Sequence, residues 1–395
     1  MTDPTTAVVL AAGEGRRLRP LTQYQPKPML PVANRPIIDY VVDALLSAGM
    51  KDIVVIVGHQ RRRLQDHLMQ AYPDVELRYV HQHNQLGSGD ALSQVAAEVS
   101  GEFVVVNGDN IIDETMVKQT VEQYHRENVA ATVAVSRSER ASNYGTVCIE
   151  NGRVTTILEH NGDGDQGRIN VGVYVFDEEI FAALADTSMR SGELSLTDAI
   201  PHLSGRVVPA VPDGVWFDPA YPWDLLSVTE RLQSAHPELL TGDATPPLVD
   251  ETARVHDAAT LGDEIIVGPG CEIAAGAVLH NGACLESDVR VGANAVINRS
   301  QIGADSRVGA NATLRDAVVG AGVTIGEATA APGGTADFAV EGRVHRDRQL
   351  GSIVSDRATV GANVTLSPGT RVGPNVEISP GGTVGGGLVE QGVIR

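Results

Sequence analysis

The chain has 395 residues and a formal net charge of −20, with 50 acidic residues against 30 lysines and arginines. This balance argues against a nucleic-acid backbone as partner, because that interaction needs a basic footprint. No apolar run reaches about 18 residues, so we expect no membrane-spanning helix. The three cysteines lack metal-ligand spacing and the N-terminus shows no charged-then-apolar leader, so we expect a reducing cytoplasm.

Arginine dominates the cations, because lysine occurs only at Lys27, Lys51 and Lys118. Together with the many acidic residues, this usage is typical of a protein that stays soluble in concentrated salt. A genomic bias toward arginine is the alternative interpretation. Under both interpretations Lys27 stands out.

The length favours two domains, and the first is expected over residues 1–235. Short apolar runs alternate there with helical patterns, which predicts a Rossmann-like α/β domain with a mostly parallel sheet. We expect strands at 53–57, 77–80 and 103–107, and helices at 37–48, 60–71, 88–99 and 114–127. Ligands of such sheets bind beyond the carboxyl ends of the strands, where Gly13 and Asp109 both fall.

A polar, proline-containing linker at 236–250 leads to a second domain with a different period. From Val255 onward an apolar residue recurs every six positions, through Leu261, Val267 and Ile273, with Gly, Asn and Asp between. This hexapeptide repeat predicts a left-handed parallel β-helix over 251–395. The repeat breaks at 328–351, which we expect to project as an arm. Such prisms commonly associate side by side, so a homotrimer is expected.

A glycine turn follows the first apolar run, Ala7–Leu10, which we expect to be a buried strand. Gly13 and Gly15 can present backbone N–H groups to a phosphate, although turns of this kind bind nothing about as often. Three arginines and Lys27 follow within the next dozen residues, which favours a polyphosphate ligand. Neither the Walker pattern nor the dinucleotide fingerprint fits, because Arg-Arg-Leu follows Gly15.

The stretch 10–36, LAAGEGRRLRPLTQYQPKPMLPVANRP, resembles the signature of sugar-1-phosphate nucleotidylyltransferases. That signature reads Leu-Ala-Ala-Gly-x-Gly-Thr-Arg-Leu-x-Pro-Leu-Thr and is followed by Pro-Lys-Pro. The resemblance implies that Arg17 and Lys27 are catalytic cations, while Arg16 replaces the usual threonine. It also implies substrate contacts from a set of loop residues, Leu10, Ala12, Gly13 and Gly15.

Two later segments resemble the substrate-binding loops of the same family. In 81–91, Gln82, Gly87 and Ser88 take the places of residues that meet the pyrimidine base; an ordinary turn with Ser88 as helix N-cap is the alternative. The sugar contacts implied further on are Gly145, Glu159 and Asn170. Glu159 could instead be an exposed strand-end acid, and Asn170 an edge or cap residue. The sequence Glu159-His160-Asn161 departs from the Glu-Lys-Pro of many thymidylyltransferases and favours the uridylyltransferase type.

Two aspartates are candidates for Mg²⁺ ligands. Asp109 follows the expected strand 103–107, where the resemblance implies the family's metal carboxylate; a solvated turn aspartate is the alternative. Asp224 opens an apolar helix, where the helix dipole alone would favour an acid. Two carboxylates fit the mostly hydrated Mg²⁺ of a nucleotide site.

The whole chain resembles the two-domain sugar nucleotidylyltransferases, especially the bifunctional uridylyltransferase/acetyltransferase class. This implies Mg²⁺-dependent transfer from an NTP, UTP or dTTP, to a sugar 1-phosphate of N-acetylglucosamine or glucose type. An added acetyltransferase on the β-helix, a β-helix that is only a scaffold, and a non-catalytic sensor are the alternatives. We expect weak or absent acetyl transfer, because Ala310 stands at the family's catalytic histidine. His345 in the arm is the only substitute we weigh, and a solvated side chain is the favoured interpretation.

Overall fold

The computed structural model describes residues 5–58, 60–127, 129–138, 144–158, 167–203, 206–241, 247–389 and 393–394. The chain divides into two compact units. Unit 1 comprises Met1–Glu14, Pro26–Met29 and Ile37–Asp218, and unit 2 comprises Gly15–Gln25, Leu30–Pro36 and Pro219–Arg395. The signature stretch therefore contributes segments to both units.

Unit 1 is built on a sheet in which nine strands are described, in the order β10-β9-β11-β6-β1-β4-β5, with β8 on β11 and β12 on β8. Its strands are β1 (Thr6–Ala11), β4 (Asp52–Val57), β5 (Leu77–His81), β6 (Phe103–Asn107), β8 (Ala131–Ser138), β9 (Thr146–Glu150), β10 (Arg153–Leu158), β11 (Gly167–Phe176) and β12 (Val207–Ala210). The pairs β1/β4, β1/β6 and β4/β5 are parallel, as the alternating pattern predicts. Strand β11 is antiparallel to β6, β8 and β9, so the whole sheet is mixed.

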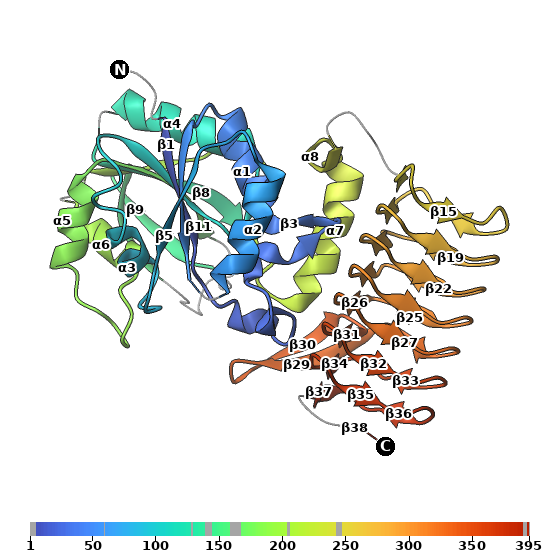
Figure 1. Ribbon diagram of the computed structural model, residues 1–395. Coiled ribbons are helices and arrows are strands. Elements are labelled where there is room, and N and C mark those ends of the chain that lie inside the picture. Colours follow the sequence, from blue (N-terminus) through green and yellow to red (C-terminus); the bar gives the residue numbers. More distant parts are fainter. Residues whose placement is uncertain are drawn as a thin grey trace. The chain divides into compact units, whose positions relative to one another are not determined.

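Helices cover both faces of this sheet (Figure 1). One layer holds α1 (Ile37–Ser47), α2 (Arg61–Ala71) and α4 (Glu114–Glu127); the other holds α3 (Ser88–Ser93), α5 (Glu179–Asp186), α6 (Leu196–Ala199) and the 3₁₀ turn η5 (Ile200–His202). Successive side chains of a strand point to opposite faces, so Val9 packs into one core and Val8 into the other. The helix expected over 88–99 ends at Ser93 and continues as turns.

The carboxyl ends of β1 and β6 lie side by side. Leu10 pairs with Asn107, and the Gly108 N–H donates to the Leu10 carbonyl at 2.9 Å. A Cβ on Gly108 would lie 2.9 Å from Val9 Cγ1, so only glycine allows this close approach. The predicted placement of Gly13 and Asp109 beyond adjacent strand ends follows from this register.

A small antiparallel ladder brings a later segment of unit 1 to the loop after Asp109. It consists of β7 (Ile111–Ile112) and β13 (Trp216–Phe217), in which Phe217 pairs with Ile111. Lys27 begins the 3₁₀ turn η3 (Lys27–Met29) in the same unit. These connections determine which carboxylates can reach Lys27.

Unit 2 contains three parallel sheets whose strands stack coil upon coil (Figure 1). The first holds β14 (Leu248–Val249), β17 (Ile266–Val267), β20 (Cys284–Leu285), β23 (Gln301–Ile302), β26 (Ala317–Val319), β31 (Ser352–Val354), β34 (Thr370–Val372) and β37 (Gly387–Val389). The second holds β15 (Arg254–Val255), β18 (Glu272–Ile273), β21 (Arg290–Val291), β24 (Arg307–Val308), β27 (Thr324–Ile325), β32 (Thr359–Val360), β35 (Glu377–Ile378) and β38 (Val393–Ile394). The third holds β16 (Thr260–Leu261), β19 (Val278–His280), β22 (Val296–Asn298), β25 (Thr313–Arg315), β28 (Ala330–Ala331), β33 (Thr365–Leu366) and β36 (Thr383–Val384).

The stacking explains the six-residue period. Leu248 pairs with Ile266 and Ile266 with Cys284, so one coil here takes 18 residues, or three hexapeptides. The repeat's apolar residues, such as Ile273, Leu279 and Leu285, come from the three different sheets and form one buried core. Asn294 and Asn311 adopt positive φ at corners, a conformation that asparagine tolerates better than most residues. The predicted β-helix is confirmed.

The repeat is interrupted by an antiparallel hairpin of β29 (Thr335–Val340) and β30 (Arg343–Gln349), within the expected arm 328–351. The coil closes beneath it, since Val318 in β26 pairs with Ile353 in β31. Unit 2 also holds several short elements and one long helix: η1 (Arg16–Leu18), η2 (Leu21–Gln23), β2 (Pro31–Val32), β3 (Arg35–Pro36), α7 (Pro222–Ala235) and α8 (Glu238–Thr241). Among the helices described, none is both long and apolar enough to cross a membrane.

Candidate active site

Lys27 lies between two carboxylates of unit 1. Its ammonium nitrogen is 2.9 Å from Asp109 Oδ2 and donates to Asp218 Oδ1 at 2.8 Å. The lysine is only 8% exposed, whereas the Asp109 side chain is 37% exposed. Lys27 is therefore a buried cation beyond the carboxyl ends of the strands. The Asp109 carboxylate beside it is partly open to solvent.

The charge of Lys27 is stable in this setting. Burial alone would lower the pKa of the ammonium group, but Asp109 and then Asp218 outweigh it and raise the pKa above its ordinary value. Lys27 therefore stays protonated at every physiological pH. It can offer a fixed positive charge, but it cannot serve as a general base.

Asp218 is a functional candidate that the sequence analysis missed. It follows β13, whose pairing with β7 carries it to Lys27 although 191 positions separate the two in the chain. The available signal was the one that singled out Asp109, an acid directly after a short apolar strand. Asp109 and Asp218 together supply two carboxylates at one point, which is the donor set that fits Mg²⁺ beside phosphates and water.

Asp224, the other predicted metal ligand, belongs to unit 2. It is the third residue of α7, and its Oδ2 accepts the backbone N–H of Tyr221 at 2.8 Å as half of a capping box. The carboxylate therefore has a role in starting the helix. Its assignment to a metal stays a prediction.

Arg17 lies in the 3₁₀ turn η1 and also belongs to unit 2. Its Nε lies 3.3 Å from Glu341 Oε2, and its guanidinium lies 5.8 Å from the centroid of the Tyr221 ring. Gly15 begins this turn at φ 62°, and its carbonyl accepts the Thr22 hydroxyl at 2.8 Å. The two predicted catalytic cations thus belong to different units.

The other loop residues of the signature lie at the end of β1 in unit 1. Leu10 is part of β1, Ala12 is buried and Gly13 is exposed. Gln85 Nε2 donates to the Ala12 carbonyl at 3.1 Å, which ties this loop to the predicted base-binding segment. Gln85 is a second residue that the sequence analysis did not single out.

The predicted base-binding segment has a defined local geometry. Gln82 is buried and its Nε2 donates to the Gly87 carbonyl at 3.0 Å and to Asp90 Oδ2 at 2.7 Å. Gly87 has φ 102°, and a Cβ there would lie 2.4 Å from the Leu194 carbonyl oxygen. Gly87, not Ser88, is the N-cap of α3, and the Ser88 hydroxyl accepts the Leu196 N–H instead.

Two of the three predicted sugar contacts are described and lie together. The Asn170 N–H donates to the Gly145 carbonyl at 2.9 Å. The Asn170 side chain is held in turn, because Nδ2 donates to the Tyr174 hydroxyl at 2.6 Å and Oδ1 accepts the Gly172 N–H at 3.1 Å. Glu159 lies outside the described residues, as do His160 and Asn161.

His345 differs from the expectation of a solvated arm histidine. Its ring centroid lies 4.7 Å from that of Tyr221 and 5.2 Å from that of Trp223, and the residue is half-buried. Burial and then the neighbouring arginines lower its pKa. The sequence could not show this packing, since it depends on the fold of unit 2.

Comparison with known proteins identifies the family of the chain. A family model described as nucleotidyl transferase matches residues 6–234, more than half of the chain. The chain belongs to this family. A second model, the GMPPB C-terminal domain, matches residues 244–335 and so covers part of the β-helix of this nucleotidyl transferase.

Individual relatives each match a little more than half of this nucleotidyl transferase. The UTP–glucose-1-phosphate uridylyltransferase AglF of Haloferax volcanii is 36% identical over 237 residues, or 58% of this chain and 96% of AglF. The bifunctional protein GlmU of Methanocaldococcus jannaschii is 31% identical over 230 residues, covering 57% of this chain and 54% of GlmU. A crystal structure of UDP-glucose pyrophosphorylase complexed with UDP-glucose has a TM-score of 0.52 at 23% identity, over 57% of this chain and 97% of that one, and shows the shared fold.

Proposed function

We propose that this nucleotidyl transferase moves a nucleotidyl group from UTP or dTTP to a sugar 1-phosphate of N-acetylglucosamine or glucose type. The products are an NDP-sugar and pyrophosphate. The observation that carries the proposal is Lys27, a buried and permanently charged ammonium group at the strand-end edge beside Asp109 and Asp218. A fixed cation in this place suits a substrate whose reacting groups are phosphates.

In the proposed reaction a phosphate oxygen of the sugar 1-phosphate attacks the α-phosphorus of the NTP, and pyrophosphate leaves. The attacking group is already an anion, so no general base is needed. This agrees with the raised pKa of Lys27, which excludes that residue as a base. Lys27 and Arg17 would meet the negative charge that develops in the transition state, so catalysis would consist of positioning and charge neutralisation.

A metal ion is part of the proposal. Bound Mg²⁺ would neutralise phosphate charge, with Asp109 as one ligand and Asp218 or Asp224 as the second. Asp218 is favoured, because it shares Lys27 with Asp109 whereas Asp224 caps α7. Within the described parts of the chain no group of three or more metal-binding side chains is found, so this site would depend on nucleotide and water for its other ligands.

The name of AglF supports UTP and glucose 1-phosphate as the first pair to test, and the word bifunctional in the name of GlmU supports a test for a second activity. The experiment is a matrix of five NTPs against the 1-phosphates of glucose, N-acetylglucosamine and galactose, with pyrophosphate release as the readout. We expect UTP or dTTP with a glucose-type or N-acetylglucosamine-type acceptor to give the highest kcat/KM. Release that occurs equally without any sugar phosphate would contradict the transfer reaction.

We expect no steady acetyl transfer on the β-helix. Ala310 stands in the corner between β24 and β25 and cannot take a proton from an amine. Incubation with acetyl-CoA and glucosamine 1-phosphate, with free thiol as the readout, should give no release above a heat-inactivated control. Steady thiol release that disappears in His345→Ala would establish the bifunctional alternative.

We further propose that the β-helix assembles into a homotrimer. The repeat builds flat parallel sheets whose corners carry glycine and alanine, and such faces permit close approach between copies. Light scattering of the full chain in concentrated salt should give three times the chain mass of 41.6 kDa. A monomer under these conditions, with intact secondary structure, would refute this assembly.

A further inference from the structure

The hairpin β29–β30 contacts one of the proposed catalytic cations. Glu341 lies at its turn, and its carboxylate is 3.3 Å from the Nε of Arg17. The side chains of Arg17 and Glu341 are 34% and 48% exposed, so the pair is accessible to a ligand. Both residues belong to unit 2, so the contact lies within one compact body.

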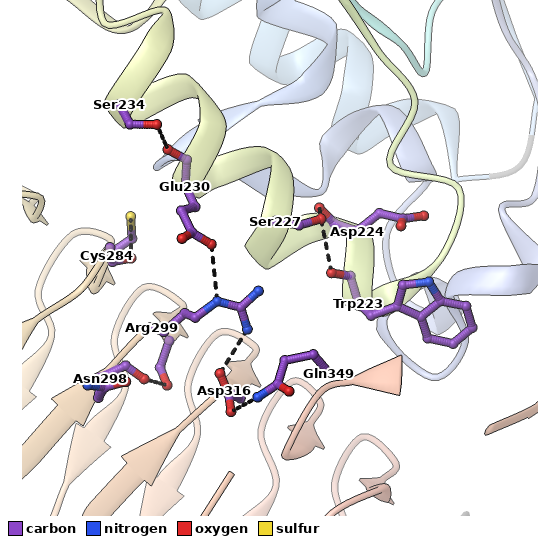
Figure 2. A network of polar contacts seen from close by, with 12 residues as sticks. Trp223, Asp224, Ser227, Glu230, Ser234, Cys284, Asn298, Arg299, Asp316 and Gln349 are labelled. Atoms are coloured by element: carbon purple, nitrogen blue, oxygen red, sulfur yellow. Dashed lines mark hydrogen bonds and ion pairs between the residues drawn. The ribbon is translucent and has the colours of Figure 1, made fainter. Parts of the chain in front are cut away.

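The foot of the hairpin is fixed by a polar network (Figure 2). Asp316 is 7% exposed and accepts from Gln349 Nε2 at 2.7 Å and from the Gly334 N–H at 3.0 Å. The same carboxylate accepts from Arg299 at 2.8 Å, and Arg299 reaches Glu230 on α7 at 3.2 Å. The hairpin, the β-helix and α7 are therefore linked by one chain of charge-assisted hydrogen bonds.

The face of the hairpin is fixed by aromatic packing. Phe338 is 1% exposed, and its ring lies 5.4 Å from that of Trp223 at the start of α7. Trp223 stacks on Tyr221 at 4.7 Å, and His345 packs against both rings. The Tyr221 ring also lies below the guanidinium of Arg17. The groups that contact Arg17 thus include a carboxylate on the hairpin and a ring that packs against His345 of the same hairpin.

We propose that Glu341 is a positioning residue for Arg17, so that the hairpin β29–β30 contributes to the proposed transfer reaction through this one cation. A carboxylate on Nε orients the guanidinium plane, so Arg17 loses less conformational freedom when it meets the phosphates. The proposal rests on the proposed function, because it concerns the same reaction. It gives the hairpin a role besides that of a scaffold.

The decisive variant is Glu341→Gln, which removes the charge and keeps the shape. Glu341 has φ 47°, and Asp347 on the same hairpin has φ 53°, so Asp347→Asn is a matched control with the same loss of charge. We expect Glu341→Gln to lower kcat/KM for the NTP two- to fivefold, which is the effect expected from the loss of a half-exposed ion pair. Asp347→Asn should leave kcat/KM unchanged. Glu341→Lys should lower it further, because a lysine would repel Arg17.

The direction of the change in kcat/KM distinguishes a positioning role of Glu341 from an inhibitory one. If Glu341 competed with the triphosphate for Arg17, its neutralisation would tighten NTP binding and raise kcat/KM. Any increase in Glu341→Gln overturns the proposal, and so does an unchanged kcat/KM. An inactive wild-type enzyme in the NTP matrix would instead count against the proposed function.

A double-mutant cycle shows whether Glu341 acts through Arg17. In an Arg17→Ala background the further change Glu341→Gln should have no effect on kcat/KM. An undiminished two- to fivefold loss in that background would mean that Glu341 acts by some other route and would overturn the assignment. With Arg17 in place, the difference in kcat/KM between the wild type and Glu341→Gln should become smaller as the salt concentration rises from about 0.1 M to about 1 M. Over this range the Debye length falls from about 10 Å to about 3 Å, so the ion pair is screened more strongly.

Discussion

Lys27→Ala is expected to lower kcat by about a hundred- to a thousandfold, which corresponds to a loss of about 2.7–4 kcal/mol of transition-state stabilisation. The ammonium group is nearly buried and held by Asp109 and Asp218, so it is already oriented before substrate binds. Water would have to reorganise to replace it. The variant also leaves two carboxylates without their shared cation, so the loss of turnover should not be rescued by added salt.

The measurement is steady-state pyrophosphate release with the NTP and sugar 1-phosphate pair that the matrix identifies. Lys51→Ala is the control, because Lys51 is an exposed lysine of the same unit. Circular dichroism and thermal unfolding of both variants show whether the fold is retained. Lys27→Ala with at least a tenth of wild-type kcat would contradict the assignment of Lys27 as a catalytic cation.

The second large effect concerns the carboxylates. We expect Asp109→Asn and Asp218→Asn each to lower kcat about a hundredfold or more and to raise the Mg²⁺ concentration needed for half-maximal activity, because each removes a charged ligand from the proposed site. Asp224→Asn should retain most activity, since an asparagine oxygen can still accept the Tyr221 N–H that caps α7. Asp52→Asn, which alters a surface ion pair with Arg78, is the control.

Titrations with Mg²⁺ from micromolar to tens of millimolar distinguish the two candidates for the second ligand. If Asp224→Asn shifts the Mg²⁺ dependence and Asp218→Asn does not, Asp224 is the ligand and Asp218 only holds Lys27. Unchanged Mg²⁺ dependence in Asp109→Asn would remove Asp109 from the site altogether. Each variant thus has an outcome that decides its role.

Much of the fold could be predicted from local sequence patterns. The apolar runs at 53–57 and 103–107 predict buried parallel strands, and the structure has β4 and β6 there. The hexapeptide period predicts the β-helix because each coil must turn its aliphatic residues into the same buried core. The helix expected at 88–99 was too long, since the apolar spacing continues through residues that the structure folds as turns.

The candidate site could be predicted only in part from local sequence patterns. Lys27 and Asp109 carry a local signal, a cation between prolines and an acid after an apolar strand, and the structure brings them to 2.9 Å. Asp218 carries the same kind of signal as Asp109, but nothing local pairs it with Lys27. The packing of His345 against Tyr221 and Trp223 likewise has no local signal.

The sequence by itself determined the α/β pattern and the coil repeat, because each depends on residues close together in the chain. Only the tertiary structure decided which charges meet: Asp218 reaches Lys27 across 191 positions, and Glu341 reaches Arg17 across 324. Such contacts depend on strand register and on where a hairpin leaves its coil. These are properties of the packed units, since burial and pairing over the whole chain select them and no short segment encodes them.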